Sequence, residues 1–174
     1  KMDRFELDGT VYTRYAKKWS DPNGLMVSEI LQDKLNKMLS ETIDFSKMQV
    51  SEIIAAGDKF KESGSIGLAV KCYDYAIPLA CKNDAAYILP RLTSCYRKRG
   101  MPQRVIDAMT DANKKYGAEI ISAALLTSAA AAYCDLDDYE KAAKCCDRAF
   151  AKLDGKASVE LSMVYKRIRA NVKE

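Results

Sequence analysis

Residues 57–64 read Gly-Asp-Lys-Phe-Lys-Glu-Ser-Gly, in which an aromatic residue, Phe60, precedes by four positions a glycine that can end a helix. The same arrangement recurs at Tyr96–Gly100, and again at Tyr133–Asp137 with an aspartate in the turn position. The first two aromatic residues are 36 positions apart and the next two are 37 apart. A spacing kept at this length predicts repeated helix–turn–helix units, each of which buries its apolar face only by stacking on a neighbour.

A second pattern follows each turn. It consists of a small or branched residue, a larger residue four positions later, and an alanine three positions after that. Small residues let helix backbones approach closely, and the larger side chains fill the space beside them. The three sets are Ala69, Tyr73 and Ala76; Val105, Met109 and Ala112; and Ala142, Cys146 and Ala149.

Over about residues 50–153 the pattern resembles the tetratricopeptide repeat (TPR), whose period is about 34 residues. The middle unit departs from the family, because Pro102 replaces the usual aromatic residue and Thr93 the usual small one. Pro90 also falls within the first helix of that unit, which must begin late or kink. The matching positions are Gly57, Phe60, Gly64, Ala69, Tyr73 and Ala76 in the first unit, and Ala130, Tyr133, Tyr139, Ala142 and Ala149 in the third.

The resemblance implies an all-α fold, in which antiparallel helix pairs form a right-handed stack. A helix over about 158–172, with one apolar and one basic side, is expected to cap the C-terminal end of that stack. A plain antiparallel helical bundle is the alternative. Within the repeats we expect helices from about Ser46 to residue 63, with Ser46 and Gln49 as a capping box, and then over 66–81, 84–98, 102–115, 118–134 and 138–152.

Three segments are predicted along the chain. Residues 1–24 alternate like strands around Asp8-Gly9, which predicts a small N-terminal β-hairpin flap of two or three strands, held to the helices by Trp19 and the tyrosines. Residues 25–45 carry an apolar stripe, including Met26, Ile30 and Leu35, that predicts a linking amphipathic helix. Residues 46–174 form the TPR-like repeat domain with its capping helix. Lys1 before Met2 suggests a vector remnant or a piece of a longer chain.

Composition indicates a folded domain in a reducing compartment. Of 174 residues, 48% are hydrophobic and 30% charged, and the net charge of +4 is too small to indicate nucleic-acid binding by itself. No apolar stretch is long enough to span a membrane, and the N-terminus has no apolar signal segment. The six cysteines lack zinc-site spacing, so we expect reduced core thiols in a cytoplasmic protein.

The sequence offers little for catalysis, and we expect neither an enzyme nor a bound cofactor or metal. The chain contains no histidine, the commonest general base. The turn Gly64–Gly67 lacks the lysine of a phosphate-binding loop. Asp135, Asp137 and Asp138 lack the central glycine and distal glutamate of a calcium-binding EF-hand loop, so a helix-to-helix turn explains them.

The resemblance implies that the first helix of each pair lines a concave groove. That face would be basic at its centre, which suits an acidic peptide, a carboxylate or a phosphate on a partner protein; ordinary solvated charges are the alternative. The lysine and asparagine with which some relatives bind chaperone C-termini are replaced by Ile54 and Asp58. The candidate partner-binding residues are Lys61, Tyr87, Arg91, Ser94, Arg97, Lys98, Thr127 and Ser128.

Three further interpretations stay open. Basic residues Arg14, Lys17 and Lys18 among the aromatic residues of the flap, with the Arg97–Arg99 run, could bind single-stranded nucleic acid by charge and stacking. The alanine-rich segment 122–133 could receive a partner, although close helix packing is its ordinary explanation. The chain could also be a helical interaction domain of a larger enzyme.

Overall fold

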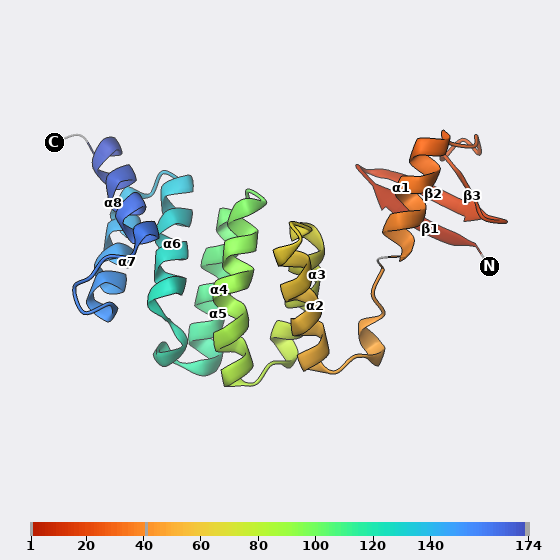
Figure 1. Cartoon of the computed structure of the whole chain (residues 1–174). Helices are drawn as coiled ribbons and strands as arrows, with labels where there is room; N and C mark the ends of the chain where they lie inside the picture. Colours follow the sequence, from red (N-terminus) through yellow and green to blue (C-terminus); the bar gives the residue numbers. More distant parts are fainter. Residues whose placement is uncertain (1, 41, 173–174) are drawn as a thin grey trace. The chain divides into compact units, whose positions relative to one another are not determined.

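The computed structural model of the chain describes residues 2–40 and 42–172, so Lys1 lies outside it. It divides into two compact units, residues 1–46 and 47–174. Within the described residues it is mostly helical, with eight α-helices and one small antiparallel sheet at the N-terminal end (Figure 1). The predominance of helix and the N-terminal strands confirm the coarse prediction.

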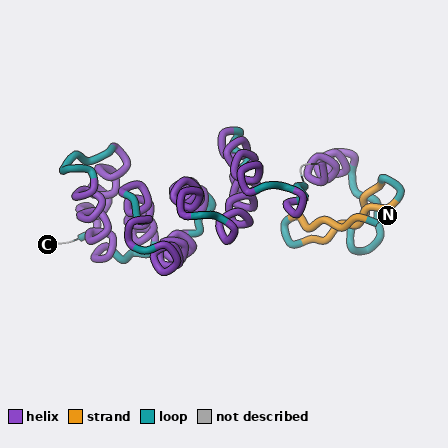
Figure 2. Tube along the Cα trace, turned by 90° about the horizontal axis from the view of Figure 1, so that it is seen from below, coloured by secondary structure: helices purple, strands orange, loops and turns teal. Residues whose placement is uncertain are grey.

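The sheet of the first unit has three strands in the order β1 (Asp3–Leu7), β2 (Thr10–Tyr15) and β3 (Lys18–Ser20) (Figure 2). Its first hairpin pairs Phe5 with Tyr12 and turns through Asp8 and Gly9, which both have positive φ, as a two-residue hairpin turn requires. The flap predicted for residues 1–24 is thus a three-stranded meander.

Trp19 joins this sheet to helix α1 (Glu29–Ser40). Its side chain is fully buried, and its indole Nε1 donates to Oδ1 of Asn36 over 2.9 Å. The Gln32 amide accepts from the Trp19 backbone N–H at 2.8 Å and donates to the Trp19 carbonyl at 2.9 Å. Gln32 thereby satisfies the backbone of β3 as a further strand would.

Helix α1 begins later than predicted. Met26 forms an isolated bridge with Ser20 instead of a helical turn, and Ile30 leaves 85% of its surface exposed. Of the predicted stripe, Leu35 is fully buried. The predicted helix was therefore too long at its N-terminal end. The spacing of apolar residues does not reveal that Met26 pairs with β3 in an extended conformation.

The second unit consists of helices connected by short turns, which stand side by side in chain order in Figure 1. The first two pairs are α2 (Val50–Glu62) with α3 (Ile66–Ala76), and α4 (Lys82–Lys98) with α5 (Pro102–Tyr116). The remaining helices are α6 (Ala123–Asp135), α7 (Tyr139–Lys152) and α8 (Val159–Asn171), and short 3₁₀ turns occupy Phe45–Lys47 (η1), Ile77–Leu79 (η2) and Ala118–Ile120 (η3).

Several predicted helix ends are wrong for identifiable reasons. The capping box of α2 is Gln49 with Glu52, so the helix begins at Val50 and not near Ser46. The helix predicted over 66–81 ends at Ala76, where η2 with Pro78 follows. The helix predicted over 118–134 begins at Ala123, because the Ser122 hydroxyl caps it by accepting from the Leu125 N–H at 3.1 Å.

The structure answers two questions that the sequence left open: how α4 accommodates Pro90, and why residues 122–133 are rich in alanine. Helix α4 runs from Lys82 through Pro90, so it does not begin late. Thr93 is fully buried, and its hydroxyl donates to the Leu89 carbonyl at 2.8 Å. In α6, Ala129, Ala130 and Ala132 are fully buried, so close packing accounts for much of the alanine-rich segment.

The helices pack on their chain neighbours throughout the second unit, and α4 also contacts α6, as α6 contacts α8. The core includes Ala69, Tyr73, Leu125 and Leu161, all of them fully buried. None of the helices within the described ranges is long and apolar enough to cross a membrane.

Candidate functional site

Two of the eight candidate residues, Tyr87 and Arg91, belong to a bonded cluster around Asp58. The Asp58 carboxylate, on α2, accepts hydrogen bonds from Tyr73 at 2.5 Å and from Tyr87 at 2.6 Å. Arg91 completes the cluster, with its Nε 3.8 Å from Asp58 Oδ1 and its guanidinium 3.5 Å above the Tyr87 ring. The cluster joins α2, α3 and α4. Tyr87 and Arg91 therefore stabilise the packing of these helices.

The pKa values of both phenols of this cluster are raised. Burial, and then the hydrogen bond to Asp58, raise the pKa of Tyr73. The hydrogen bond to the same carboxylate is the largest cause that raises the pKa of Tyr87. Both tyrosines therefore remain protonated donors at neutral pH, which keeps the cluster intact.

Four other candidate residues line one cavity of about 570 Å³ between α4, α6 and α8. Ser94 and Arg97 come from α4, and Thr127 and Ser128 come from α6. The wall that α8 provides includes Met163, Val164 and Arg167, and the sequence had assigned that helix only to capping. The rule used for the groove, that the first helix of each pair lines it, could have identified these residues if it had been applied to residues 158–172 as well.

Two arginines that line this cavity pair with Asp135, at the C-terminal end of α6. Arg167 Nη1 lies 2.5 Å from Asp135 Oδ1, and Arg97 Nε lies 3.5 Å from Oδ2. The hydrogen bond that Arg167 donates to Asp135 raises the pKa of Arg167. Two guanidinium groups thus share the Asp135 carboxylate beside the hydroxyls of the cavity, and Glu160 of α8 adds a second carboxylate to the lining.

Arg97 has bonding capacity left over. Its Nε is buried and makes no hydrogen bond within the described part of the chain, although the side chain as a whole is 35% exposed. A buried donor without an acceptor is uncommon in folded proteins. Because this Nε is closed to solvent and faces Asp135 Oδ2 at 3.5 Å, a ligand reaches Arg97 only through the exposed part of its side chain.

Lys61 and Lys98 belong to neither of these arrangements. Both lie close enough to Cys95 to oppose, by their charge, the rise in its pKa that burial causes. Lys98 is exposed and Lys61 half-buried, and neither lines the cavity between α4, α6 and α8. Of the predicted groove, the cavity over α4, α6 and α8 therefore contains Ser94, Arg97, Thr127 and Ser128.

Of the aromatic residues considered for stacking on nucleic acid, Trp19 is not available in the flap. Trp19 is fully buried against α1 and cannot receive a base, and Arg14 forms an ion pair with Asp3 at 3.5 Å. Tyr15 remains exposed, beside Lys17 and Lys18.

All six cysteines are free thiols, and five of them are buried. Cys81 is exposed. It was predicted to lie inside the helix over 66–81, but it occupies the N-cap of α4. Burial raises the pKa of Cys72 to about 11 and that of Cys146 to about 12. Within the ranges that the structure describes, no group of three His, Cys, Asp or Glu side chains is placed to hold a metal ion.

We expect one fast thiol. At pH 8 the buried cysteines stay protonated because their pKa values are raised, and only the thiolate attacks a disulfide reagent. DTNB should therefore modify Cys81 on the order of tenfold faster than the other five. Mass spectrometry of the early product should locate one adduct on Cys81, and Cys81→Ser should remove the fast phase. Two or more fast thiols in the unmodified protein would contradict this assignment.

The sequence comparisons yield no relative: no protein-family model matches the chain, and a search of curated proteins finds no significant match.

Proposed function

We propose that the chain is a non-catalytic scaffold of the tetratricopeptide type that binds an acidic peptide or partner domain over α4, α6 and α8. The observation that carries this proposal is the cavity of about 570 Å³ where Ser94, Arg97, Thr127 and Ser128 meet. Its volume is in the range of ligand pockets, and it combines hydroxyl groups with the part-exposed side chain of an arginine. Carboxylates are the natural partners of such a group.

Two features support the repeat assignment. The helices pack as successive neighbours, and the first helices of the second and third pairs, α4 and α6, also contact each other, as expected when first helices line one face. The small residues of the pattern lie at close helix contacts: a Cβ atom added to Gly57 would lie 2.8 Å from the Tyr73 ring. In this arrangement α8 occupies the position that the first helix of a fourth pair would have.

A binding role also suits the chemistry of the chain. There is no histidine to act as a general base, and burial raises the pKa values of five of the six thiols. Reduced, buried cysteines are typical of proteins that work in a reducing compartment, so we place the function in the cytoplasm.

Filling the cavity should abolish capture. A random peptide library displayed on phage, selected on the intact chain, should yield ligands enriched in aspartate and glutamate. Ser128→Trp should weaken their binding by about tenfold or more, since the indole occupies the space of the ligand. Arg97→Gln should weaken it by about three- to tenfold, because one charged donor is lost.

The matched control is Ala55→Trp, which places the same side chain on an exposed position of α2 outside the cavity. It should bind the selected peptides like the parent protein. Glutamate at Arg91 or Arg97 is a poor choice, because it would face Asp58 or Asp135 and unfolding would mimic lost binding. Peptides without acidic enrichment, or equal binding by Ser128→Trp, would contradict the proposal.

A further inference from the structure

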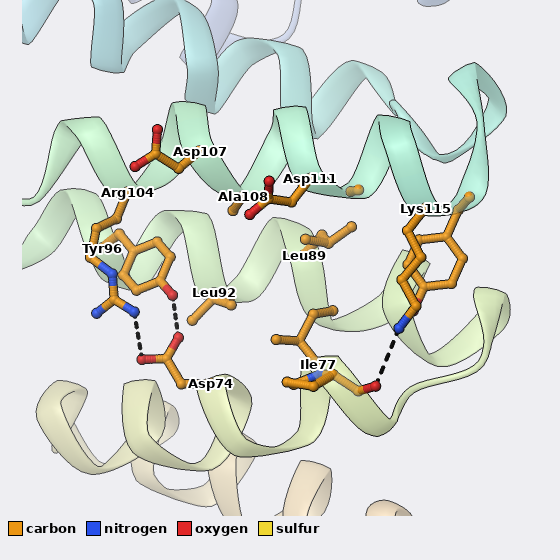
Figure 3. A pocket seen from close by; sticks show the side chains of 13 residues that line it. Asp74, Ile77, Leu89, Leu92, Tyr96, Arg104, Asp107, Ala108, Asp111 and Lys115 are labelled. Carbon is orange, nitrogen blue, oxygen red and sulfur yellow. Dashed lines mark hydrogen bonds and ion pairs between the residues drawn. The ribbon is translucent and has the colours of Figure 1, made fainter.

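A second cavity, of about 460 Å³, lies between the α3–η2 segment and α5, with α4 as its floor. It shares no lining residue with the cavity over α4, α6 and α8. Figure 3 shows it as a slot that runs along α5. The α5 residues that line it extend from Arg104 to Tyr116, which is about three helical turns.

Cross-links at both ends keep the slot open. At one end the Asp74 carboxylate accepts hydrogen bonds from the Tyr96 hydroxyl and from Arg104 Nη2, the latter at 3.0 Å. At the other end Lys115 donates to the Pro78 carbonyl at 3.2 Å and Tyr116 donates to the Ala80 carbonyl at 2.8 Å. These bonds tie α5 to the α3–η2 segment at two places and leave the middle of the slot unfilled.

The floor of the slot is apolar. It is formed by Leu89 and Leu92 of α4, with Ile77 on one side and Ala108 and Ala112 on the other. Leu89 and Leu92 are almost fully buried. The accessible apolar surface of the slot therefore comes from Ile77, Pro78 and Ala108. Such a surface accepts the methylene stem of a long side chain, because lysine and arginine bury their stems on apolar surface while the charged group stays near water.

The rim in the middle of the slot is acidic. Asp107 and Asp111 stand one turn apart on α5, and both are among the residues that line the slot (Figure 3). Asp107 accepts one hydrogen bond from Gln103, and Asp111 makes no hydrogen bond or ion pair within the described residues. The two cations of the lining stand at the ends: Arg104 pairs with Asp74, whereas Lys115 donates to the neutral Pro78 carbonyl and keeps its charge. Three carboxylates (Asp74, Asp107 and Asp111) against these two cations leave the lining with a net charge of −1.

From this geometry we propose that the slot is a docking site for an extended basic segment of a partner protein, with arginines at alternate positions paired to Asp107 and Asp111. Four residues along a helix advance about 6 Å. Two residues along an extended chain advance about 6.6 Å and face the same side. The two spacings agree, and the arginine stems lie on Ile77, Pro78 and Ala108.

The test measures fluorescence anisotropy of a labelled peptide, Gly-Arg-Ala-Arg-Gly, with the whole chain at about 0.15 M salt, where distant charges are screened. Because the chain itself carries a net charge of +4, binding of this peptide requires a local acidic site. The double variant Asp107→Asn with Asp111→Asn should weaken binding by about tenfold, since it removes both charges and keeps the shape.

Two matched controls separate the slot from general effects. Asp33→Asn with Glu62→Gln removes the same charge at exposed positions outside both cavities and should bind like the parent protein. Ala108→Phe, which fills the slot, should lose binding, whereas Asn113→Phe on the exposed side of α5 should keep it. Circular dichroism checks that each variant stays helical.

Unchanged binding in the double variant, or equal loss in the charge control, would overturn the proposal. Spermidine that competes as tightly as the peptide would overturn a peptide segment as the occupant. Ser128→Trp, which fills the other cavity, should leave binding of the basic peptide unchanged. The two proposals can therefore fail separately.

Discussion

Trp19→Ala should unfold the first unit while the second keeps its helices. Removing a fully buried tryptophan costs about 3–5 kcal/mol, and this variant also loses the hydrogen bond to Asn36. A unit of 46 residues with a small core has little stability to spare. The free energy lost should therefore exceed the stability of the packing between the sheet and α1.

Hydrogen–deuterium exchange read by mass spectrometry measures this directly, because it reports on each segment separately. Amides of β2, β3 and α1 should exchange at the rate of an unfolded chain in the variant, while those of α4 and α6 stay protected. Tyr15→Ala is the matched control, since Tyr15 is 73% exposed, and it should leave exchange almost unchanged. Protected strands in Trp19→Ala would show that the unit is held by other contacts.

Gly57→Val should destabilise the second unit by about 2–3 kcal/mol. A Cβ atom at residue 57 would lie 2.8 Å from one Tyr73 ring carbon and 3.1 Å from two others. Tyr73 cannot move away, because it is fully buried and its hydroxyl is held by Asp58. The clash must push α2 and α3 apart, which also strains the Asp58 cluster.

Gly67 provides the matched control, because a Cβ atom there would also meet a neighbour at 2.8 Å. That neighbour is the end of the Arg99 side chain, which is exposed and free to swing aside. Gly67→Ala should therefore gain up to about 1 kcal/mol of helix propensity. Urea unfolding of the two variants should shift the midpoint in opposite directions. A stable Gly57→Val would mean that the contact of α2 with α3 is looser than the structure has it.

Local chemistry made part of this molecule predictable. Asp8-Gly9 indicated the first hairpin, because few residues adopt positive φ at both turn positions. Periodicity located the helices, since apolar and small residues must recur on the buried face. Helix ends were harder: the true capping box begins at Gln49, and nothing in the sequence ranked it above the rival that begins at Ser46.

The candidate site was predictable only in its central part. Ser94, Arg97, Thr127 and Ser128 do meet in one cavity, because they occupy equivalent faces of α4 and α6. Arg91 was misjudged, since its pairing with Asp58 joins residues 33 positions apart in the chain. Arg167 was missed for the same reason: its carboxylate partner, Asp135, lies on another helix.

The sequence by itself determined which segments are helical, where the hairpin turns, and that small residues alternate with aromatic ones at a repeat spacing. These features depend on backbone preferences and on neighbours within one or two turns. The tertiary structure alone decided which charges are already bonded, which cavities stay open, and that Asp107 and Asp111 line an apolar slot. Those outcomes depend on how side chains from distant helices meet, and the periodicity of one helix carries no information about the partner that another helix presents.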